Sequence, residues 1–216
     1  MYKEAKNLVD YKNIIFDLGG VILNLDYNKT VEEFKRHIPD LDESVFFGKE
    51  HQLSFFSKYE IGQISTEVFK KDFLENYKIK MTDEEFESCW NAMIYDFPIE
   101  RIVLIERLRG LGKKVYLLSN INELHECAVE NSFSRLKLAT SFRDLFNKLY
   151  YSHRIGLRKP KQDVFEFVLR DSSLVKEETL FIDDSQHHVI GARKAGIDSI
   201  HLQKPQVLED LGIFKF

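Results

Sequence analysis

A short apolar run that ends abruptly in an acid does most to limit the fold of this chain. Residues 14–16 are Ile, Ile and Phe, and Asp17, Gly19 and Gly20 follow at once. The run is β-branched and aromatic and does not alternate with polar residues, which indicates a strand buried on both faces of a parallel sheet. A carboxylate at the end of such a strand lies where open α/β folds bind ligands. On these residues alone, an ordinary strand followed by a turn aspartate explains the pattern equally well.

Four further apolar runs alternate with helical patterns in the second half of the chain. The runs cover residues 115–118, 148–151, 179–182 and 199–202, and helical spacing is found in residues 98–111, 124–128, 165–169 and 189–196. Strands separated by helices predict βαβ units and therefore an α/β fold with a parallel sheet. Right-handed crossovers then place the carboxyl ends of all strands at one edge of this sheet.

A helical block separates the first strand from the others. Residues 21–25 are too close to the first strand for a crossover and predict a hairpin-like flap, whereas residues 28–97 have helical spacing throughout. Ser65 or Thr66 can cap one helix, and Thr82 with Glu85 forms a capping box for another. We therefore expect a helical cap domain of residues 28–97, inserted into an α/β core domain of residues 1–27 and 98–216.

Polar residues of matching chemistry stand at the ends of these strands. They are Asp17, Ser119 with Asn120, Asp183 with Asp184, and Lys159 in a loop after another strand. Carboxylates suit a hard divalent cation, hydroxyl and backbone N–H groups suit phosphate oxygens, and a lysine supplies a point charge. A carboxylate can also attack phosphorus to give an aspartyl-phosphate. Polar residues often end strands, but four such groups at one sheet edge favour a functional site.

The motifs that these residues form resemble those of a known family. FDLGGV at 16–21, LSN at 118–120, RKP at 158–160 and FIDDS at 181–185 occur in the order and spacing of the haloacid dehalogenase-like (HAD) hydrolases. The helical block resembles the C1-type cap of this family. The sequences of the motifs are most similar to those of the branch that contains bacterial α-D-glucose-1-phosphate phosphatase. The resemblance implies a three-layer α/β sheet with strand order 5-4-1-2-3.

The resemblance also implies a metal site. Asp17 would be both the nucleophile and a ligand of Mg²⁺. The backbone carbonyl of Gly19 and the carboxylate of Asp184 would be further ligands, and Asp183 would bind directly or through water. Attack of one anion on another needs such a cation to lower the repulsion between them.

The remaining motif residues would bind the phosphoryl group. The resemblance implies that Ser119 and the backbone N–H of Asn120 hold it while it is transferred, and that Lys159 neutralises it. The expected activity is Mg²⁺-dependent hydrolysis of a small phosphomonoester through an aspartyl-phosphate on Asp17. The best substrate prediction is a sugar phosphate such as a hexose 1-phosphate.

One position departs from the family pattern. Phosphatases of this family usually carry a second aspartate two residues after the nucleophile as general acid and base, and this chain has Gly19 there. Loss of a general acid slows the departure of a poor leaving group by about 10²–10⁴-fold. Either the leaving group is intrinsically good, as an anomeric oxygen is, or another group such as Asp26 or His125 supplies the proton. A third alternative is a non-catalytic module that binds phosphorylated sugars.

A metal-independent 2-haloacid dehalogenase is a further alternative. Dehalogenases of this superfamily also lack the second aspartate, but they lack the paired acids late in the chain as well. Asp183 and Asp184 would repel each other if no cation lay between them. We therefore rank the dehalogenase below the phosphatase.

Other polar residues are weaker candidates for the site. In C1-capped relatives the turn between two cap helices reaches over the site, so Glu60 and Gln63 are candidates for substrate contact. His125 lies one turn into the helix after Ser119, where it either faces the site or is a capping or surface histidine. His187 and His188 are expected to be solvated, because neighbours on a helix point to different faces.

Composition limits the partners of the chain. Its 31 basic and 35 acidic residues nearly balance, which gives no reason to expect a nucleic acid or an acidic membrane surface as a partner. No apolar run approaches the length of a membrane span, and the charged N-terminus lacks the apolar core of a signal peptide. The two cysteines, Cys89 and Cys127, form no metal-type pair and suit a reducing compartment. We expect a cytoplasmic monomer or weak dimer that binds a phosphorylated small molecule.

Overall fold

A parallel sheet of five strands forms the centre of the computed structural model, which describes residues 10–41 and 54–211. The strands are β1 (Asn13–Phe16), β2 (Lys114–Ser119), β3 (Lys148–Tyr151), β4 (Thr179–Asp183) and β5 (Asp198–His201). Their spatial order is β3-β2-β1-β4-β5. The α/β fold class and the strand order expected from the family resemblance are therefore confirmed.

The first strand lies in the middle of the sheet and is buried on both faces. Ile15 pairs with Tyr116 of β2 on one side and with Phe181 of β4 on the other. Ile14 and Phe16 pack into one hydrophobic cluster, whereas Ile15 packs into a second cluster on the opposite face. This double burial explains why the strand reads as an unbroken apolar run rather than as an alternating one.

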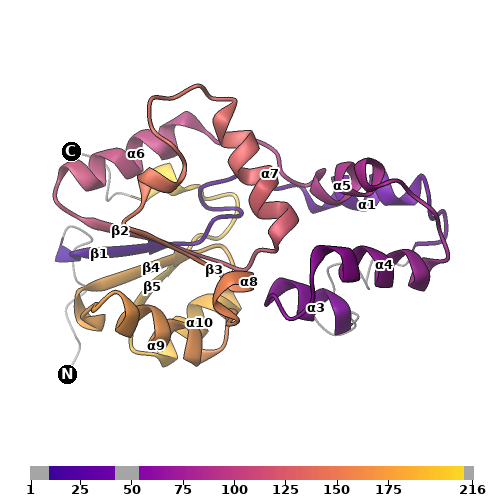
Figure 1. The fold of residues 1–216 in the computed structure, drawn as a ribbon. Helices are drawn as coiled ribbons and strands as arrows, with labels where there is room; N and C mark the ends of the chain where they lie inside the picture. Colours follow the sequence, from indigo (N-terminus) through magenta and orange to yellow (C-terminus); the bar gives the residue numbers. More distant parts are fainter. Residues whose placement is uncertain (1–9, 42–53, 212–216) are drawn as a thin grey trace.

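Helices cover both faces of the sheet. They are α6 (Ile99–Gly110), α7 (Glu123–Ser134), α9 (Gln162–Asp171) and α10 (Gln186–Lys194), with the short helices α8 (Ser152–Ile155), η2 (Arg143–Leu145), η3 (Lys176–Glu178) and η4 (Leu208–Asp210) between or after them. Figure 1 shows α6 and α7 on one side of the sheet and α9 and α10 on the other. The long helices follow the predicted alternation of strands and helices. The four short helices were not predicted, because each has only three or four residues.

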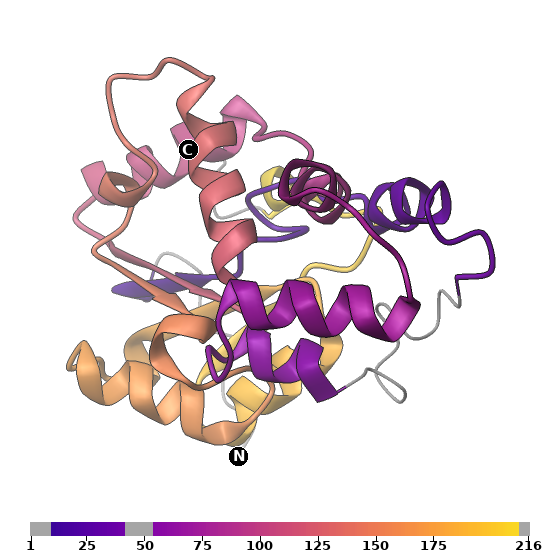
Figure 2. The same cartoon turned by 45° about the vertical axis from the view of Figure 1, so that its right-hand side comes forward.

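Within residues 27–41 and 54–91, four more helices lie together beyond one edge of the sheet (Figure 2). They are α1 (Tyr27–Lys35), α3 (Ser54–Glu60), α4 (Thr66–Tyr77) and α5 (Asp83–Asn91). Their inward faces form a separate cluster that includes Phe34, Phe69, Phe73 and Trp90. The predicted caps are present, with Ser65 accepting from the Val68 N–H and Thr82 forming the capping box. We call these helices the cap; the exact domain boundaries at 28 and 97 stay a prediction.

The chain enters and leaves the cap through two neighbouring segments. Leu25 and Ile94 form an antiparallel bridge, and the Asp26 N–H donates to the Met93 carbonyl at 2.9 Å. The segment before Leu25 is a tight turn rather than the expected hairpin-like flap, because the Leu23 N–H donates back to Leu18 at 2.9 Å. This compact turn holds the start of the cap close to the end of β1.

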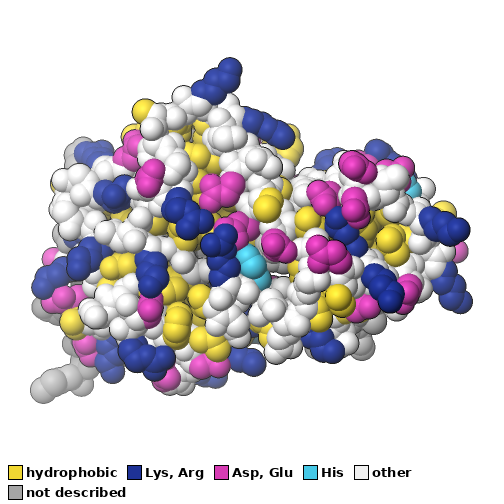
Figure 3. Space-filling model, in the orientation of Figure 1, with side chains coloured by type: hydrophobic (Ala, Val, Ile, Leu, Met, Phe, Trp, Pro, Cys, Tyr) yellow, Lys and Arg dark blue, Asp and Glu magenta, His cyan; other side chains and the backbone are white. Residues whose placement is uncertain are grey.

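The surface carries both signs of charge. On the face of the molecule seen in Figure 3, which has the orientation of Figure 1, acidic and basic side chains are interspersed, including where the cap meets the core. Among residues 10–41 and 54–211, no helix is both long and apolar enough to cross a lipid bilayer.

Candidate active site

A buried lysine joins two acids at the carboxyl edge of the sheet. The Lys159 Nζ atom lies 2.6 Å from Asp17 Oδ1 and 2.7 Å from Asp183 Oδ2. Asp17 directly follows β1 and Asp183 ends β4, and the register of these two strands pairs Phe16 with Ile182. Each acid therefore stands one residue beyond a paired position, so the two carboxylates come to lie side by side. The Lys159 side chain is completely buried.

The charges of this group depend on each other. Burial raises the pKa of the Asp17 carboxyl, although the Lys159 ammonium opposes this effect. Burial also acts on Asp183, but Lys159 and His188 outweigh it and lower the pKa of that carboxyl. Burial alone would lower the pKa of Lys159, and the two acids raise it instead. The lysine is therefore held in its charged form, as electrostatic stabilisation of a phosphoryl group requires.

A third acid completes a cluster with the geometry of a cation site. Asp17, Asp183 and Asp184 each place one carboxylate oxygen within 4.8 Å of the others. Burial, and after it the charges of Asp17 and Asp183, raises the pKa of Asp184 to about 7. Oxygen ligands from several carboxylates are the donor set that Mg²⁺ prefers in proteins. The residues present therefore fit a divalent metal ion, which would relieve the repulsion between the acids.

Two glycines shape the turn that faces this cluster. Gly20 has a φ of +75°, and a Cβ atom on it would overlap the Asp184 carboxylate. Only glycine combines this conformation with so close an approach to the acid. A Cβ atom on Gly19 would overlap the Cδ1 atom of Leu25. The role of the Gly19 carbonyl as a metal ligand stays a prediction.

The second motif lies beside the lysine. Ser119 ends β2, the strand next to β1, and is buried. The Asn120 side chain accepts from the Lys159 N–H at 2.9 Å and donates to the Lys159 carbonyl at 3.0 Å. The sequence predicted a role for the Asn120 backbone and missed this side-chain clamp, which holds the main chain of the lysine. The structure thus brings Ser119 and Asn120 to the same sheet edge as the acids.

The end of α3 reaches from the cap toward the lysine loop. Glu60 Oε2 lies 2.8 Å from Arg158 Nη1, and the Glu60 carbonyl accepts from Ser152 Oγ at 2.6 Å. Burial raises the pKa of the Glu60 carboxyl, while Arg158 and then His188 and Lys159 act to lower it. Glu60 thus lies against the loop that carries Lys159, and its contact with a substrate stays a prediction. Gln63 is exposed, and no contact found among the described residues joins it to the acid cluster.

His125 serves the interface between cap and core. Its Nε2 atom donates to the Trp90 carbonyl at 3.0 Å, and its Nδ1 atom accepts from the Asn122 amide at 3.1 Å. Its ring stacks on that of Trp90 with the centroids 5.1 Å apart. Burial lowers the pKa of His125 to about 4. Both ring nitrogens are thus occupied in the neutral form, which argues against His125 as the missing proton donor. Asp26 likewise caps α1 through the Asn28 N–H.

The structure overturns one expectation about the two adjacent histidines. His188 is not solvated, because its Nδ1 atom lies 3.0 Å from both carboxylate oxygens of Asp183. His187 is exposed, as predicted. The signal that was missed is helix position: Ser185 is the residue before the first turn of α10, and His188 is the third helical residue, whose side chain commonly reaches back over the helix start.

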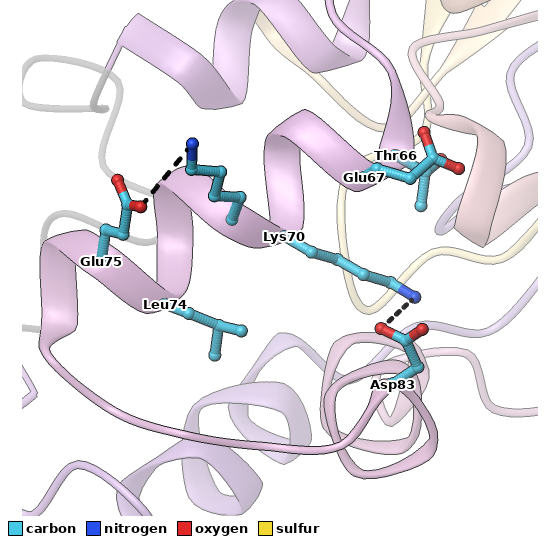
Figure 4. Close-up of a pocket in the computed structure, with 7 residues that line it drawn as sticks. Thr66, Glu67, Lys70, Leu74, Glu75 and Asp83 are labelled. Carbon is cyan, nitrogen blue, oxygen red and sulfur yellow. Dashed lines mark ion pairs between the residues drawn. The ribbon is translucent and has the colours of Figure 1, made fainter.

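A hollow between α4 and α5 lies apart from these groups (Figure 4). Its lysines are already paired, Lys70 with Asp83 at 3.2 Å and Lys71 with Glu75 at 3.8 Å. Leu74 supplies part of its apolar wall. The mutual pairing of these charges makes the hollow a salt-bridged surface of the cap.

Comparison with known proteins agrees with this geometry. Residues 14–202 match the family described as haloacid dehalogenase-like hydrolase. A D-ribitol-5-phosphate phosphatase from Bacteroides thetaiotaomicron is 32% identical over 192 residues, which cover 87% of this chain and 90% of the relative. A phosphorylated carbohydrates phosphatase from Thermotoga maritima is 24% identical over 195 residues, covering 87% of this chain and 83% of that protein.

A solved structure is similar over nearly the same length. It is a HAD family enzyme from Bacteroides thetaiotaomicron in complex with magnesium and inorganic phosphate. Its TM-score with this chain is 0.82 at 31% identity, and the match covers 90% of this chain and 96% of that chain. With a family match that runs from the first strand to the last, and relatives similar over most of their length, the chain belongs to the haloacid dehalogenase-like hydrolases.

Proposed function

We propose that this enzyme is a Mg²⁺-dependent phosphatase that hydrolyses a small sugar or polyol phosphate through a phospho-aspartate on Asp17. The observation that carries the proposal is the buried ammonium of Lys159, held between Asp17 and Asp183 beside a third acid. This arrangement offers a carboxylate nucleophile next to a fixed positive charge. Phosphoryl transfer is catalysed mainly by such positioning and charge neutralisation.

In the first step, a carboxylate oxygen of Asp17 attacks phosphorus. The bond between phosphorus and the leaving oxygen breaks, and its electron pair stays on that oxygen, which then takes up a proton. Lys159 neutralises the phosphoryl oxygens, and Ser119 and the Asn120 N–H would orient them. In the second step, water attacks the phospho-aspartate, releases inorganic phosphate and restores the carboxylate.

The acids beside the nucleophile would hold the metal ion. Asp17 and Asp184 supply carboxylate oxygens, the carbonyl of Gly19 is a further candidate ligand, and Asp183 lies in the same cluster. When bound, Mg²⁺ supplies Lewis-acid neutralisation of the phosphoryl group. Two findings support this assignment: the solved neighbour holds magnesium and phosphate, and the curated relatives are phosphatases.

The relatives favour a polyhydroxylated substrate. One of them is described as acting on D-ribitol 5-phosphate and another on phosphorylated carbohydrates. A phosphorylated primary alcohol such as ribitol 5-phosphate has a poorer leaving group than a hexose 1-phosphate. If this chain shares that substrate, a good leaving group no longer explains Gly19, and a proton donor other than a residue at position 19 is required. A pentitol phosphate therefore joins the hexose 1-phosphate as a leading prediction.

The test is phosphate release from a panel of phosphomonoesters, with Mg²⁺ and with EDTA. The panel contains ribitol 5-phosphate, glucose 1-phosphate, glucose 6-phosphate and a prenyl phosphate. We expect release from a sugar or polyol ester that requires Mg²⁺ and is abolished in Asp17→Asn, with the fold of that variant intact by circular dichroism. Turnover that survives in Asp17→Asn contradicts the nucleophile.

Two outcomes would favour the other functions. Halide release from a 2-haloacid in EDTA would identify a dehalogenase. Stabilisation of the protein by phosphosugars without turnover would identify a binding module, since a ligand that binds only the folded state raises its stability. The cytoplasmic location and the monomeric or weakly dimeric state remain predictions.

A further inference from the structure

The imidazole of His188 is bound to the carboxylate that anchors Lys159. Its Nδ1 atom lies 3.0 Å from each carboxylate oxygen of Asp183, and the His188 side chain is 21% exposed. The Asp183 carboxylate, which accepts this bond, is completely buried. A buried carboxylate is costly unless hydrogen bonds satisfy it, so each of its partners matters for where it points.

Among the described residues, three donors give hydrogen bonds to Asp183. Oδ2 accepts from Lys159 Nζ at 2.7 Å, Oδ1 accepts from the Ser185 N–H at 2.7 Å, and the His188 imidazole bridges both oxygens. The Ser185 bond fixes only one oxygen. The imidazole is the one of these three donors that contacts both oxygens, so it limits the rotation of the carboxylate about its own axis. That rotation determines where Oδ2 meets the lysine.

Lys159 in turn depends on this anchor. Its main chain is clamped by Asn120, and its Nζ atom is held by the two acids within 2.7 Å of it and lies 5.4 Å from the centre of the Phe181 ring. One of these acids, Asp17, is the proposed nucleophile and loses its carboxylate charge when the phospho-aspartate forms. Asp183 is therefore the partner that can hold the ammonium throughout the reaction.

We propose that His188 is a positioning residue, which orients Asp183 through its Nδ1–H group and thereby fixes the Lys159 ammonium for phosphoryl transfer. The assignment rests on the proposed function of Lys159. His188 acts through Asp183, whereas its neighbour His187 points to solvent and has no such role. The chain thus offers a matched control one residue away on the same helix.

The first experiment compares two amide replacements that differ in reach. The amide nitrogen of asparagine can take the place of Nδ1, whereas that of glutamine matches Nε2. We expect His188→Asn to retain kcat within about threefold and His188→Gln to lose about 10–100-fold in kcat with KM nearly unchanged, as for other residues that orient a catalytic group. His187→Gln should keep the wild-type values. A merely structural role predicts equal losses for the two His188 variants, and wild-type kcat in His188→Gln overturns the proposal.

The second experiment does not depend on turnover. A long-range ¹H–¹⁵N spectrum of histidine-labelled enzyme at pH 8 in EDTA reports which ring nitrogen carries the proton, and the His188 signals are assigned by their loss in His188→Asn. We expect the Nδ1–H form, and the Nε2–H form overturns the proposal. If wild-type enzyme releases phosphate from no ester while His188 shows the Nδ1–H form, the proposed function fails and the contact to Asp183 stands. If the enzyme turns over and the proton is on Nε2, only the inference fails.

Discussion

Leu25 occupies the space into which a side chain at position 19 would extend. A Cβ atom built on Gly19 would overlap the Leu25 Cδ1 atom, and Leu25 is half-buried beside the turn that follows β1. Gly19 has no positive φ, so the backbone itself would accept another residue. An aspartate placed at this position therefore requires the Leu25 side chain to move.

The first prediction concerns this contact. Gly19→Ala should destabilise the protein by about 1–3 kcal/mol, because the added methyl group overpacks the turn against Leu25. Shortening the neighbour in Leu25→Ala should remove most of this cost, which a double-mutant cycle of urea unfolding measures. Gly110→Ala is the control, because a Cβ atom there meets nothing within 4 Å and should be neutral or stabilising by up to about 1 kcal/mol. Equal stability of Gly19→Ala and wild type would contradict the overlap.

The second prediction separates the roles of the paired acids. Asp183 already accepts bonds from Lys159, Ser185 and His188, whereas burial and the other two acids raise the pKa of Asp184 to about 7. Asp184→Asn should therefore raise the dissociation constant for Mg²⁺, and the increase should be at least about tenfold larger than that caused by Asp183→Asn. Titration calorimetry of the unliganded enzyme with Mg²⁺ measures both dissociation constants. A larger loss in Asp183→Asn would identify that residue as the main ligand instead.

The sequence predicted the sheet and the acids at its edge because both depend on local patterns. Residues 14–16 and 179–182 are continuous apolar runs, and their burial on both faces is what such runs require. Once the strands are parallel, Asp17 and Asp183 must meet at one edge. Strand register and topology therefore transmit the prediction from sequence to site.

Contacts made by side chains between distant elements could not be predicted in this way. The Glu60–Arg158 pair joins the cap to the core, and nothing in either segment specifies how the cap docks. The Asn120 clamp and the His188 contact depend on the direction of a side chain within one turn of its element. Predicting the Glu60–Arg158 pair requires the complete fold. Predicting the contacts of Asn120 and His188 requires the local geometry at the end of a strand and at the start of a helix.

The third prediction concerns the docking of the cap. The Glu60–Arg158 ion pair spans 2.8 Å, with the two side chains 18% and 29% exposed. Arg158→Gln should weaken the docking of the cap on the core by roughly 1 kcal/mol, the upper end for a partly exposed pair, which is about a fivefold change in an equilibrium constant. Hydrogen exchange of the amides at the end of α3 should speed up by about that factor. Lys71→Gln breaks an exposed pair within α4 and should leave those amides unchanged.

The fourth prediction is a pH dependence of stability that arises at His125. Burial lowers the pKa of this histidine to about 4 in the folded protein, whereas its unfolded value is about 6.5. The unfolded chain therefore binds a proton first, so the contribution of His125 to stability is complete above pH 6.5 and is lost as the pH falls toward 4. Between pH 7.5 and 5 the loss should be about 2 kcal/mol.

The measurement is the difference in unfolding free energy between wild type and His125→Gln across this range. Acids such as Glu60 and Asp184, whose pKa values burial raises, titrate alike in both proteins and cancel in the difference. At pH 7.5 the variant should be the less stable protein, because it loses the bonds to Trp90 and Asn122. The gap should narrow steadily as the pH falls, while His187→Gln follows the wild-type curve. A gap that stays constant down to pH 5 would mean that His125 protonates in place, with its bond to the Trp90 carbonyl intact and its ring turned from Asn122.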